Sequence, residues 1–342
     1  MRFALPGFLS LFLLGCGPDF DPPSELHSLR VLAVQKDKPY AQPGDTVNLQ
    51  MLWEDASLNA GRPVTIAWSA PCFDPEGDLY YLCFADKSLF GSGEPVLGDS
   101  TTIKLPTDII SKRPPPSQTR NAPYGIAYVF FAACAGTLTP IPVTGSNTFP
   151  IGCKDADGKL LGADDFVAGY TSVYSFEGFS NNNPDISGFE LDGKALQATE
   201  FCQDADCIAQ ASSNVPDPDS IDCSTDDARC IPTCAADGDS SCKAWSVRPI
   251  LDKTAEANQD TDEVSAKLVG RHLGEQMWIN YYTDAGSLKS PVRLLNDASA
   301  GWNDDYGAKF YAPKAPGLVR LWGVVHDNRG GAAWAGVTLK VQ

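Results

Sequence analysis

The sequence predicts a mainly β protein of two antiparallel β-sandwich domains in tandem, with a disulfide-rich loop insertion. Three observations lead to this prediction. Short apolar or alternating runs are separated by Gly, Pro, Asn and Asp turns, which is the pattern of antiparallel strands. No long stretch repeats its apolar residues at the spacing of a helix. Six of the 11 cysteines and nine aspartates fall within residues 200–243, a segment that cannot bury a core of its own.

The first residues are expected to be a secretion signal and not a membrane span. One basic residue, Arg2, precedes an apolar stretch over residues 3–14. This stretch is shorter than the roughly 20 residues that cross a bilayer. Directly behind it, Leu13-Leu14-Gly15-Cys16 resembles the lipobox of bacterial lipoproteins. The resemblance implies removal of residues 1–15 as a signal peptide and acylation of Cys16, whose chains, palmitate among them, would hold the protein at a membrane.

Residues 16–28 are rich in proline and acid and are expected to form a tether between this anchor and the folded part. Because Gly17 and not an aspartate follows Cys16, analogy with enteric bacteria favours the outer membrane of the cell envelope. We therefore expect a lipid-anchored envelope protein, on the periplasmic or the outer face.

Cysteine usage indicates an oxidising compartment. Once Cys16 is set aside, ten cysteines remain, an even number suited to disulfide pairing. The candidates are Cys72, Cys83, Cys134, Cys153, Cys202, Cys207, Cys223, Cys230, Cys234 and Cys242. Cys72 and Cys83 are expected to close a local loop, and the spacing leaves the other pairings open. A zinc site in the insertion is the alternative, but no Cys-x2-Cys pair or neighbouring histidine supports it.

The first domain is expected over residues 29–180. Pro43-Gly44 predicts a turn between its first two strands, and Trp68 is expected to point into the core. The long apolar run of residues 124–133 is typical of a strand buried between two sheets. Together these features match an Ig-like sandwich. Its strands are expected at residues 29–35, 46–53, 64–68, 101–105, 124–133 and 166–176.

The second domain is expected over residues 181–342, after a Ser-Asn-Pro junction at residues 180–184, and it contains the insertion 200–243. The run Asp327-Asn328-Arg329-Gly330-Gly331 predicts a tight hairpin, because Asn and paired glycines accept positive φ. The strands of this domain are expected at residues 186–193, 278–282, 308–311, 318–325 and 333–341.

The closing hairpin is similar to the last two strands of bacterial Ig-like and polycystic-kidney-disease-type modules. The chain as a whole resembles a group of lipoproteins of gliding soil bacteria with two Ig-like domains. The resemblance covers most of the mature chain and implies fold and anchoring but no activity. The features that carry it are the lipobox, the tether, the strand at residues 29–34, Pro43-Gly44, Asn183-Pro184, Leu191-Asp192-Gly193 and the closing hairpin.

The charge and the acidic loops restrict the partners. With 43 acidic and 26 basic residues, the net charge is −17, which repels phosphate backbones, so we expect no nucleic-acid partner. Asp155 and Asp157, with aspartates of the insertion, are weak candidates for calcium ligands. Asp155-Ala156-Asp157-Gly158 lacks the rest of an EF-hand loop, however, and a solvated acidic loop is the default interpretation.

No catalytic motif is present, and we expect no enzyme. The only histidines are His27, His272 and His326, and His326 is expected in an exposed turn. Aromatic pairs such as Tyr80-Tyr81 and Tyr281-Tyr282 are expected mainly in the core, and Trp302 and Trp334 likewise, although aromatic faces also bind sugars and partners.

The leading hypothesis is therefore a non-enzymatic binding, structural or adhesion module of the envelope. It is attached to the membrane through Cys16 and binds a protein or a carbohydrate. The long loops at residues 73–98 and 202–242 are where a partner is expected. The alternatives are an envelope glycan hydrolase that uses paired carboxylates, or an accessory subunit of an envelope complex.

Overall fold

The computed structural model describes residues 22–92, 94–113, 122–142, 149–196, 200–202, 221–225, 227–234, 242–251 and 273–342. The predicted signal peptide, Cys16, Cys207 and His272 lie outside the described residues, as does the side chain of Cys202.

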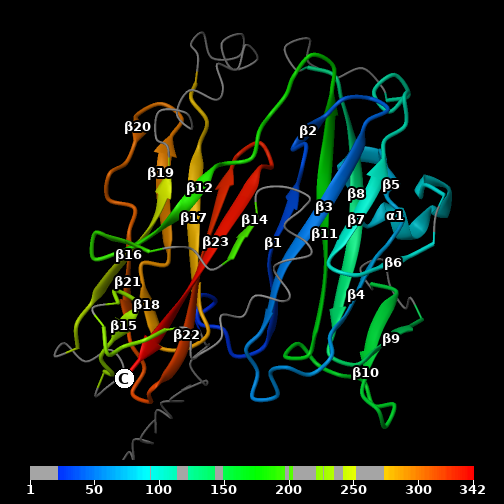
Figure 1. Ribbon diagram of the computed structural model, residues 1–342. Coiled ribbons are helices and arrows are strands. Elements are labelled where there is room, and N and C mark those ends of the chain that lie inside the picture. The colour runs from blue at the N-terminus through cyan, green and yellow to red at the C-terminus, as the bar shows by residue number, and fades with distance from the viewer. Residues whose placement is uncertain are drawn as a thin grey trace, which may run out of the picture.

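The first sandwich consists of two sheets that face each other across a core (Figure 1). The three-stranded sheet has the order β1-β3-β7, with β1 at Leu29–Lys36, β3 at Thr46–Asp55 and β7 at Ser100–Lys104. The opposite sheet has the order β2-β11-β8-β4-β6, and β5 also pairs with β8. These strands are β2 (Tyr40–Ala41), β11 (Phe166–Phe176), β8 (Tyr124–Cys134), β4 (Thr65–Trp68), β6 (Val96–Leu97) and β5 (Cys72–Phe73).

Alternation along the strands forms the core of this sandwich. Every second residue of β3, from Val47 through Met51, points inward and meets Val129 and Phe131 of β8 and the fully buried Trp68. The indole nitrogen of Trp68 donates a hydrogen bond to the Gly98 carbonyl over 2.9 Å, so its polar atom is satisfied.

Short elements connect these strands. They are the 3-10 turns η1 (Glu76–Asp78) and η2 (Lys87–Leu89), the one-turn helix α1 (Leu82–Ala85), and the hairpin of β9 (Thr137–Pro140) and β10 (Ile151–Lys154).

The second sandwich has the same two-layer plan. One sheet has the order β13-β12-β16-β21-β18, and the other has the order β14-β23-β22-β17-β19-β20, with β15 parallel to β23. The strands of the first are β12 (Ile186–Leu191), β13 (Lys194–Leu196), β16 (Trp245–Leu251), β18 (Ser287–Lys289) and β21 (Ala308–Tyr311). Those of the second are β14 (Glu200–Cys202), β15 (Cys230–Ile231), β17 (Met277–Thr283), β19 (Val292–Asp297), β20 (Gly301–Trp302), β22 (Gly317–Asp327) and β23 (Ala332–Val341).

The strand order confirms the predicted fold class. In the first sandwich, β1, β3 and β7 take the places of the A, B and E strands of an Ig domain, and β4, β8 and β11 take those of C, F and G. In the second sandwich, β12-β16-β21 and β17-β22-β23 repeat this arrangement. The protein is mainly β, with two Ig-like antiparallel sandwiches.

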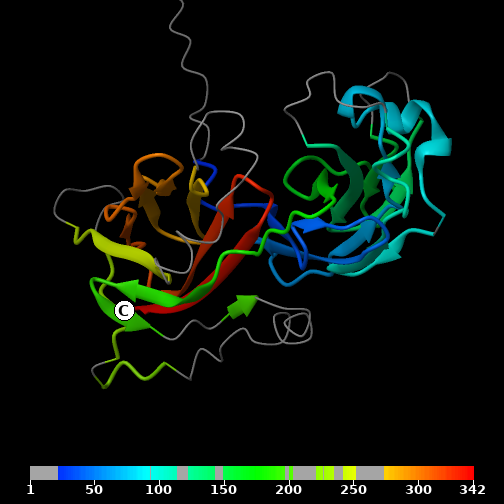
Figure 2. The same ribbon diagram turned by 90° about the horizontal axis from the view of Figure 1, so that it is seen from above.

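The two sandwiches pack side by side through the outer faces of two sheets (Figure 2). Leu32 and Leu52 of β1 and β3 meet Trp322 and Trp334 of β22 and β23 in one apolar cluster. Leu26, which is fully buried, belongs to the same cluster. Because apolar sheet faces cover each other here, the two sandwiches form one packed body.

The position of Leu26 corrects the predicted tether of residues 16–28. Ser24 and Ser28 are buried as well, and the Leu26 amide donates a hydrogen bond to the Thr283 carbonyl over 2.8 Å. Leu26 packs between the sandwiches, so residues 22–28 belong to the folded body and not to a tether.

Polar groups close the rim of this contact. Asn181 donates to the Asp327 carboxylate over 2.8 Å, and the second oxygen of Asp327 accepts the backbone N–H groups of Arg329 and Gly331, both over 2.7 Å. Lys36 lies beside them, and burial lowers the pKa of its amine from 10.5 to about 8. Asp327 therefore shapes the closing turn and joins it to the segment between the sandwiches.

His326 lies within β22 and not in an exposed turn, which corrects the sequence prediction. The strand continues through Asp327, so the turn begins only after it. The imidazole stacks on the Trp278 ring with centroids 5.4 Å apart. Burial lowers the pKa of His326 from 6.5 to about 4, against the attraction of Asp327.

Within the described residues, four disulfides confirm that the chain is cross-linked, and they join eight of the ten candidate cysteines. The pairs are Cys72–Cys83, Cys134–Cys153, Cys223–Cys230 and Cys234–Cys242. The first closes the local loop that the sequence predicted. Each of the others also joins two described cysteines that follow one another in the sequence.

Candidate functional site

A loop fastened by a disulfide covers the outer face of the first sandwich. β5 pairs with β8 at Cys72 and Tyr128, and the Cys72–Cys83 disulfide links α1 to β5. Phe84 of α1 packs on Phe130 of β8 with ring centroids 4.7 Å apart. β8 is thus buried on both faces, but its outer cover is this loop and not the second sheet that the apolar run suggested.

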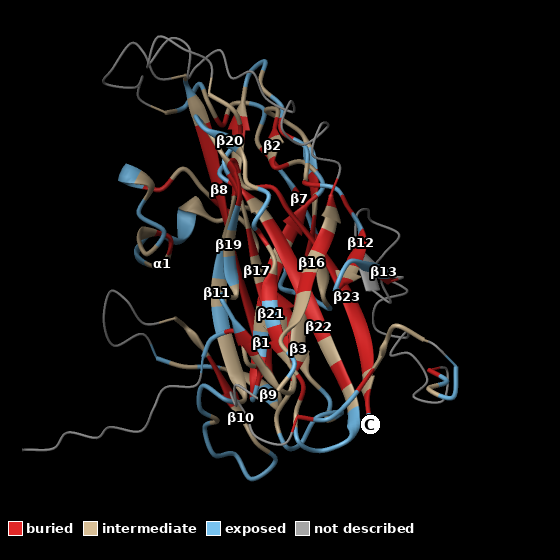
Figure 3. Ribbon diagram, turned by 90° about the vertical axis from the view of Figure 1, so that its left-hand side faces the viewer, coloured by how far each residue is buried: buried red, intermediate tan, exposed pale blue. Residues whose placement is uncertain are grey.

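A row of aromatic rings lies on β2, β11 and β8 and includes one ring of the loop, Tyr80. We call it the aromatic strip; its members are Tyr40, Tyr80, Tyr124, Tyr170, Tyr174 and Phe176. Three of them alternate along β11, so the pleat places them on one face. Figure 3 shows the result: β11 is largely exposed or intermediate where β8 beside it is buried. The strip is exposed at Tyr80 and Tyr170 and half-buried at its other members.

Ring contacts link the members of the strip in two groups. Tyr80 stacks on Tyr170 with centroids 4.4 Å apart, and these two are 38% and 44% exposed. Further along, Tyr124 contacts Tyr174 at 5.8 Å and Phe176 at 5.9 Å. Phe176 contacts Tyr40 on β2 at 4.7 Å. An exposed aromatic pair beside further half-buried rings is a candidate interaction site.

A charged corner holds one end of the strip. Arg113 forms ion pairs with Asp74 over 3.1 Å and Asp78 over 2.7 Å, and its guanidinium lies 4.4 Å from the centroid of the Tyr124 ring. The Tyr124 hydroxyl donates to Asp78, and the Tyr128 hydroxyl donates to the Asp78 carbonyl over 2.7 Å. These contacts fix the orientation of the strip and of the loop together.

The backbone and the pKa values mark this corner as unusual. Asp74 and Asp78 have positive φ values of 46° and 59°, which residues other than glycine rarely adopt. Burial raises the pKa of the Asp74 carboxyl, and Arg113 opposes the rise. Burial also raises the pKa of the Tyr124, Tyr128 and Tyr174 phenols above the ordinary value of 10.

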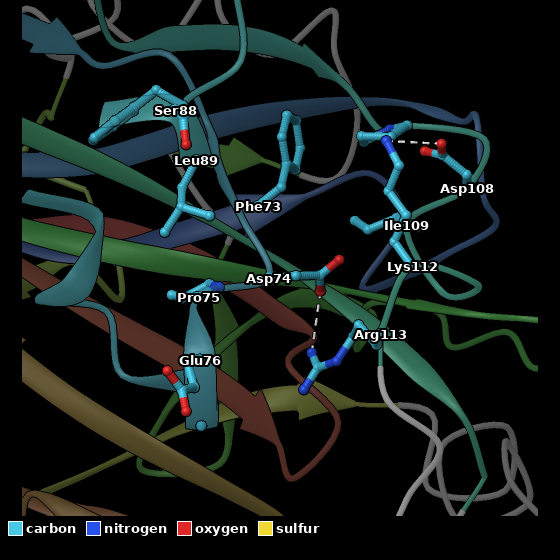
Figure 4. Close-up of a pocket in the computed structure, with 13 residues that line it drawn as sticks. Phe73, Asp74, Pro75, Glu76, Ser88, Leu89, Asp108, Ile109, Lys112 and Arg113 are labelled. Carbon is cyan, nitrogen blue, oxygen red and sulfur yellow. Dashed lines mark hydrogen bonds and ion pairs between the residues drawn. The ribbon is translucent and has the colours of Figure 1, made fainter. Parts of the chain in front are cut away.

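A pocket of about 400 Å³ opens next to the corner (Figure 4). Phe73, Leu89 and Phe90 of the loop form one apolar wall, and Pro106 and Ile109 form the other. Its polar lining is Asp74, Glu76, Ser88, Asp108, Lys112 and Arg113. The volume lies within the range of small-ligand pockets.

The structure does not bring the other sequence candidates into this site. Asp155 lies in the turn after β10, and its carboxylate accepts the amides of Asp157 and Lys159 over 3.0 and 2.9 Å. Across the described residues, no group of three or more His, Cys, Asp or Glu side chains is placed to hold a metal. Calcium therefore stays a prediction. Tyr281 and Trp334 are buried, as expected.

Sequence reasoning expected Tyr80 mainly in the core, whereas the structure leaves it 38% exposed, and it missed the rest of the strip and Arg113. A usable signal was present, because Tyr170, Tyr174 and Phe176 occupy alternate positions of one strand, and the pleat places such positions on one face. The contacts of Arg113 had no local signal, since its partners lie 35 and 39 residues away.

No protein-family model matches the chain, and no curated protein matches it. Among solved structures, the chain is similar to the D00-D0 domain of intimin at 9% identity, with a TM-score of 0.22 and coverage of 92% of this chain and 98% of that one. The D0-D1 domain of intimin gives 10% identity, a TM-score of 0.19 and coverages of 91% and 96%.

The α2-macroglobulin of E. coli gives 10% identity and a TM-score of 0.24, over 95% of this chain but 16% of that one. TM-scores this low assign no function, and the fold assignment rests on the strand order above. None of the helices in the described ranges is both long and apolar enough to cross a bilayer.

Proposed function

We propose that this protein is a lipid-anchored, non-enzymatic binding module of the bacterial cell envelope, and that the aromatic strip binds a protein partner with a basic surface. The observation that carries the proposal is the exposed Tyr80–Tyr170 stack, held in place by the disulfide-fastened loop. Anchoring rests on the lipobox at Cys16.

The chemistry of the strip suits a protein interface. Tyrosines supply a large, rigid and amphipathic contact area at low entropic cost, and they are enriched among the residues that dominate binding energy. Arg113 and Asp78 hold Tyr124 in position before any partner arrives, which lowers the cost of ordering it on binding. The net charge of −17 favours a partner of opposite charge.

On this proposal, the anchor would lie near one end of β11, and the strip would extend from the middle of that strand to its other end. The Leu29 amide bonds to the Asp164 carbonyl, so the N-terminal segment lies at the Phe166 end of β11. Along β11 the strip runs from Tyr170, in the middle of the strand, to Phe176, which lies about 30 Å from the Phe166 end at the usual rise of an extended chain. Because residues 16–22 reach roughly 20 Å at most, an acylated Cys16 would keep the Phe166 end close to the membrane.

The site gives less support to the hydrolase alternative. Within the pocket, Asp74 is ion-paired with Arg113, and Asp108 is ion-paired with Lys112 over 2.8 Å. A glycosidase needs one carboxyl that can donate a proton and a second that stays ionised beside the substrate. Both of these aspartates are instead held by cations.

The binding experiment uses the mature chain with Cys16→Ser, so that acyl chains do not drive sedimentation. Its binding to purified envelopes is measured before and after treating the envelopes with protease or with periodate. We expect the Tyr80→Ala/Tyr170→Ala variant to bind about tenfold or more weakly, as loss of central aromatic contacts predicts. Tyr311→Ala, a half-buried tyrosine of the second sandwich, is the control.

Protease treatment of the envelopes should abolish binding, and periodate should not. Equal binding of the double variant and the control would refute the role of the strip. Loss of binding after periodate alone would identify a carbohydrate and refute the protein partner. The anchor has its own test: the intact mass of protein extracted from its native membrane should show a chain that begins at Cys16 and carries acyl groups.

A further inference from the structure

We infer that the pocket beside the aromatic strip receives an alkylammonium group, namely a lysine side chain of the partner, with its methylene stem between the apolar walls and its cation at the acidic rim. This inference rests on the proposed function for the identity of the partner. The site itself is defined by its own walls and charges.

The walls are built before any ligand arrives. On one side, the Gly91 amide donates to the Pro71 carbonyl over 2.7 Å, which returns the loop to the start of β5 beside the Cys72–Cys83 disulfide. On the other side, Ile109 is buried in the sandwich core, and its amide donates to the Pro106 carbonyl. A stem of methylene groups between such walls loses contact with water without requiring the walls to move.

The charges at the rim select the sign of the ligand. Three carboxylates, Asp74, Glu76 and Asp108, and two cations, Lys112 and Arg113, line the pocket. The pairs Asp74–Arg113 and Asp108–Lys112 compensate each other, which leaves the lining with one negative charge. That charge falls to Glu76, whose side chain is exposed at the rim. A cation on the ligand gains this attraction, and an anion is repelled.

The pocket and the strip share a boundary. Arg113 lines the pocket and at the same time lies over the Tyr124 ring of the strip. A partner seated on the strip therefore has a pocket within reach of its next residues. This arrangement, an aromatic surface with an adjoining pocket for one anchoring side chain, is how protein interfaces concentrate affinity and specificity.

The test uses hexylammonium as the probe and hexanoate, of the same chain length and opposite charge, as its counterpart. Binding to the full mature chain is followed by NMR titration of the backbone amides. We expect saturable shifts at Gly77, Ser88 and Gly91 with hexylammonium, and none with hexanoate. Equal binding of the two probes, or shifts remote from the pocket, would overturn the inference.

Variants locate the site. Glu76→Gln should weaken hexylammonium binding about fivefold, the factor that corresponds to ~1 kcal/mol for an exposed ion pair. Glu94→Gln makes the same charge change at an exposed residue outside the pocket lining and should have no effect. Ser88→Trp should block the pocket and abolish binding. Unchanged affinity in both Glu76→Gln and Ser88→Trp would refute the site.

Failure of this inference and failure of the proposed function give different results. The Tyr80→Ala/Tyr170→Ala variant should keep its affinity for hexylammonium, because neither residue lines the pocket. If hexylammonium binds as described but strip variants retain full envelope binding, the pocket stands and the proposed function fails. If strip variants lose envelope binding but hexylammonium does not bind, the proposed function stands and the inference about the pocket fails.

Discussion

Acidification should destabilise this protein through one histidine at the contact between the sandwiches. His326 stacks on Trp278, and Asp327 and Lys36 are the charged groups that act on it. Burial holds the pKa of His326 near 4, against 6.5 for an ordinary histidine, because the charged imidazolium loses its hydration in the folded protein. The attraction of Asp327 only partly offsets this loss.

The sign and size follow from linkage. Between pH 6.5 and about 4, the unfolded chain binds a proton at His326 that the folded chain does not. Stability is therefore fully present above pH 6.5 and is lost as the pH falls towards 4. The difference between the two pKa values corresponds to at most about 3.4 kcal/mol of unfolding free energy.

The assay compares urea unfolding of the wild type and His326→Phe at several pH values from 7 to 4. Phenylalanine keeps a ring for the stack on Trp278 but does not titrate, so effects of other carboxylates cancel in the difference. We expect the variant to gain about 2–3 kcal/mol relative to the wild type over this range. His27→Phe, at an exposed histidine, should give no such gain. A pH-independent difference between His326→Phe and the wild type would refute the reasoning.

Two further predictions concern the packed N-terminal segment and the fastened loop. Leu26→Ala should lower the free energy of unfolding by about 2–5 kcal/mol, because Leu26 is fully buried between the sandwiches. The control, Leu58→Ala at a fully exposed leucine, should change it by less than about 0.5 kcal/mol. Equal effects of the two variants in chemical denaturation would contradict the packing of the segment. Replacing Cys72 and Cys83 with alanine should cost about 3 kcal/mol from loop-closure entropy and should weaken envelope binding in the sedimentation assay, whereas unchanged binding would separate the loop from the strip.

Several parts of the fold could be predicted from local sequence. The strands at β3, β8, β11 and β22 follow from alternation or apolar runs between turn residues, because those patterns depend only on which face of a strand is buried. β16 and β19 were missed. Their residues mix charge, proline and apolar side chains, and only the neighbouring strands decide that they pair.

The candidate site was less accessible to prediction. The sequence indicated the loop at residues 73–98, but it favoured a core position for Tyr80 and gave no reason to join either to β11. Tyr80 meets Tyr170, and Arg113 meets Asp74 and Asp78, only because β8 carries the loop on one side and β11 on the other. Such contacts depend on strand pairing over long sequence separations.

The sequence by itself determined the β class, the two-sandwich organisation and the presence of cross-links, because turn residues, period-two alternation and cysteine content act locally. Only the tertiary structure decided that Leu26 is buried, that His326 lies in a strand and that Tyr80 of the loop stacks on Tyr170 of β11. Each of these outcomes depends on which faces meet when sheets pack. Which faces meet depends on residues far apart in the sequence, so it cannot be predicted from a local sequence pattern.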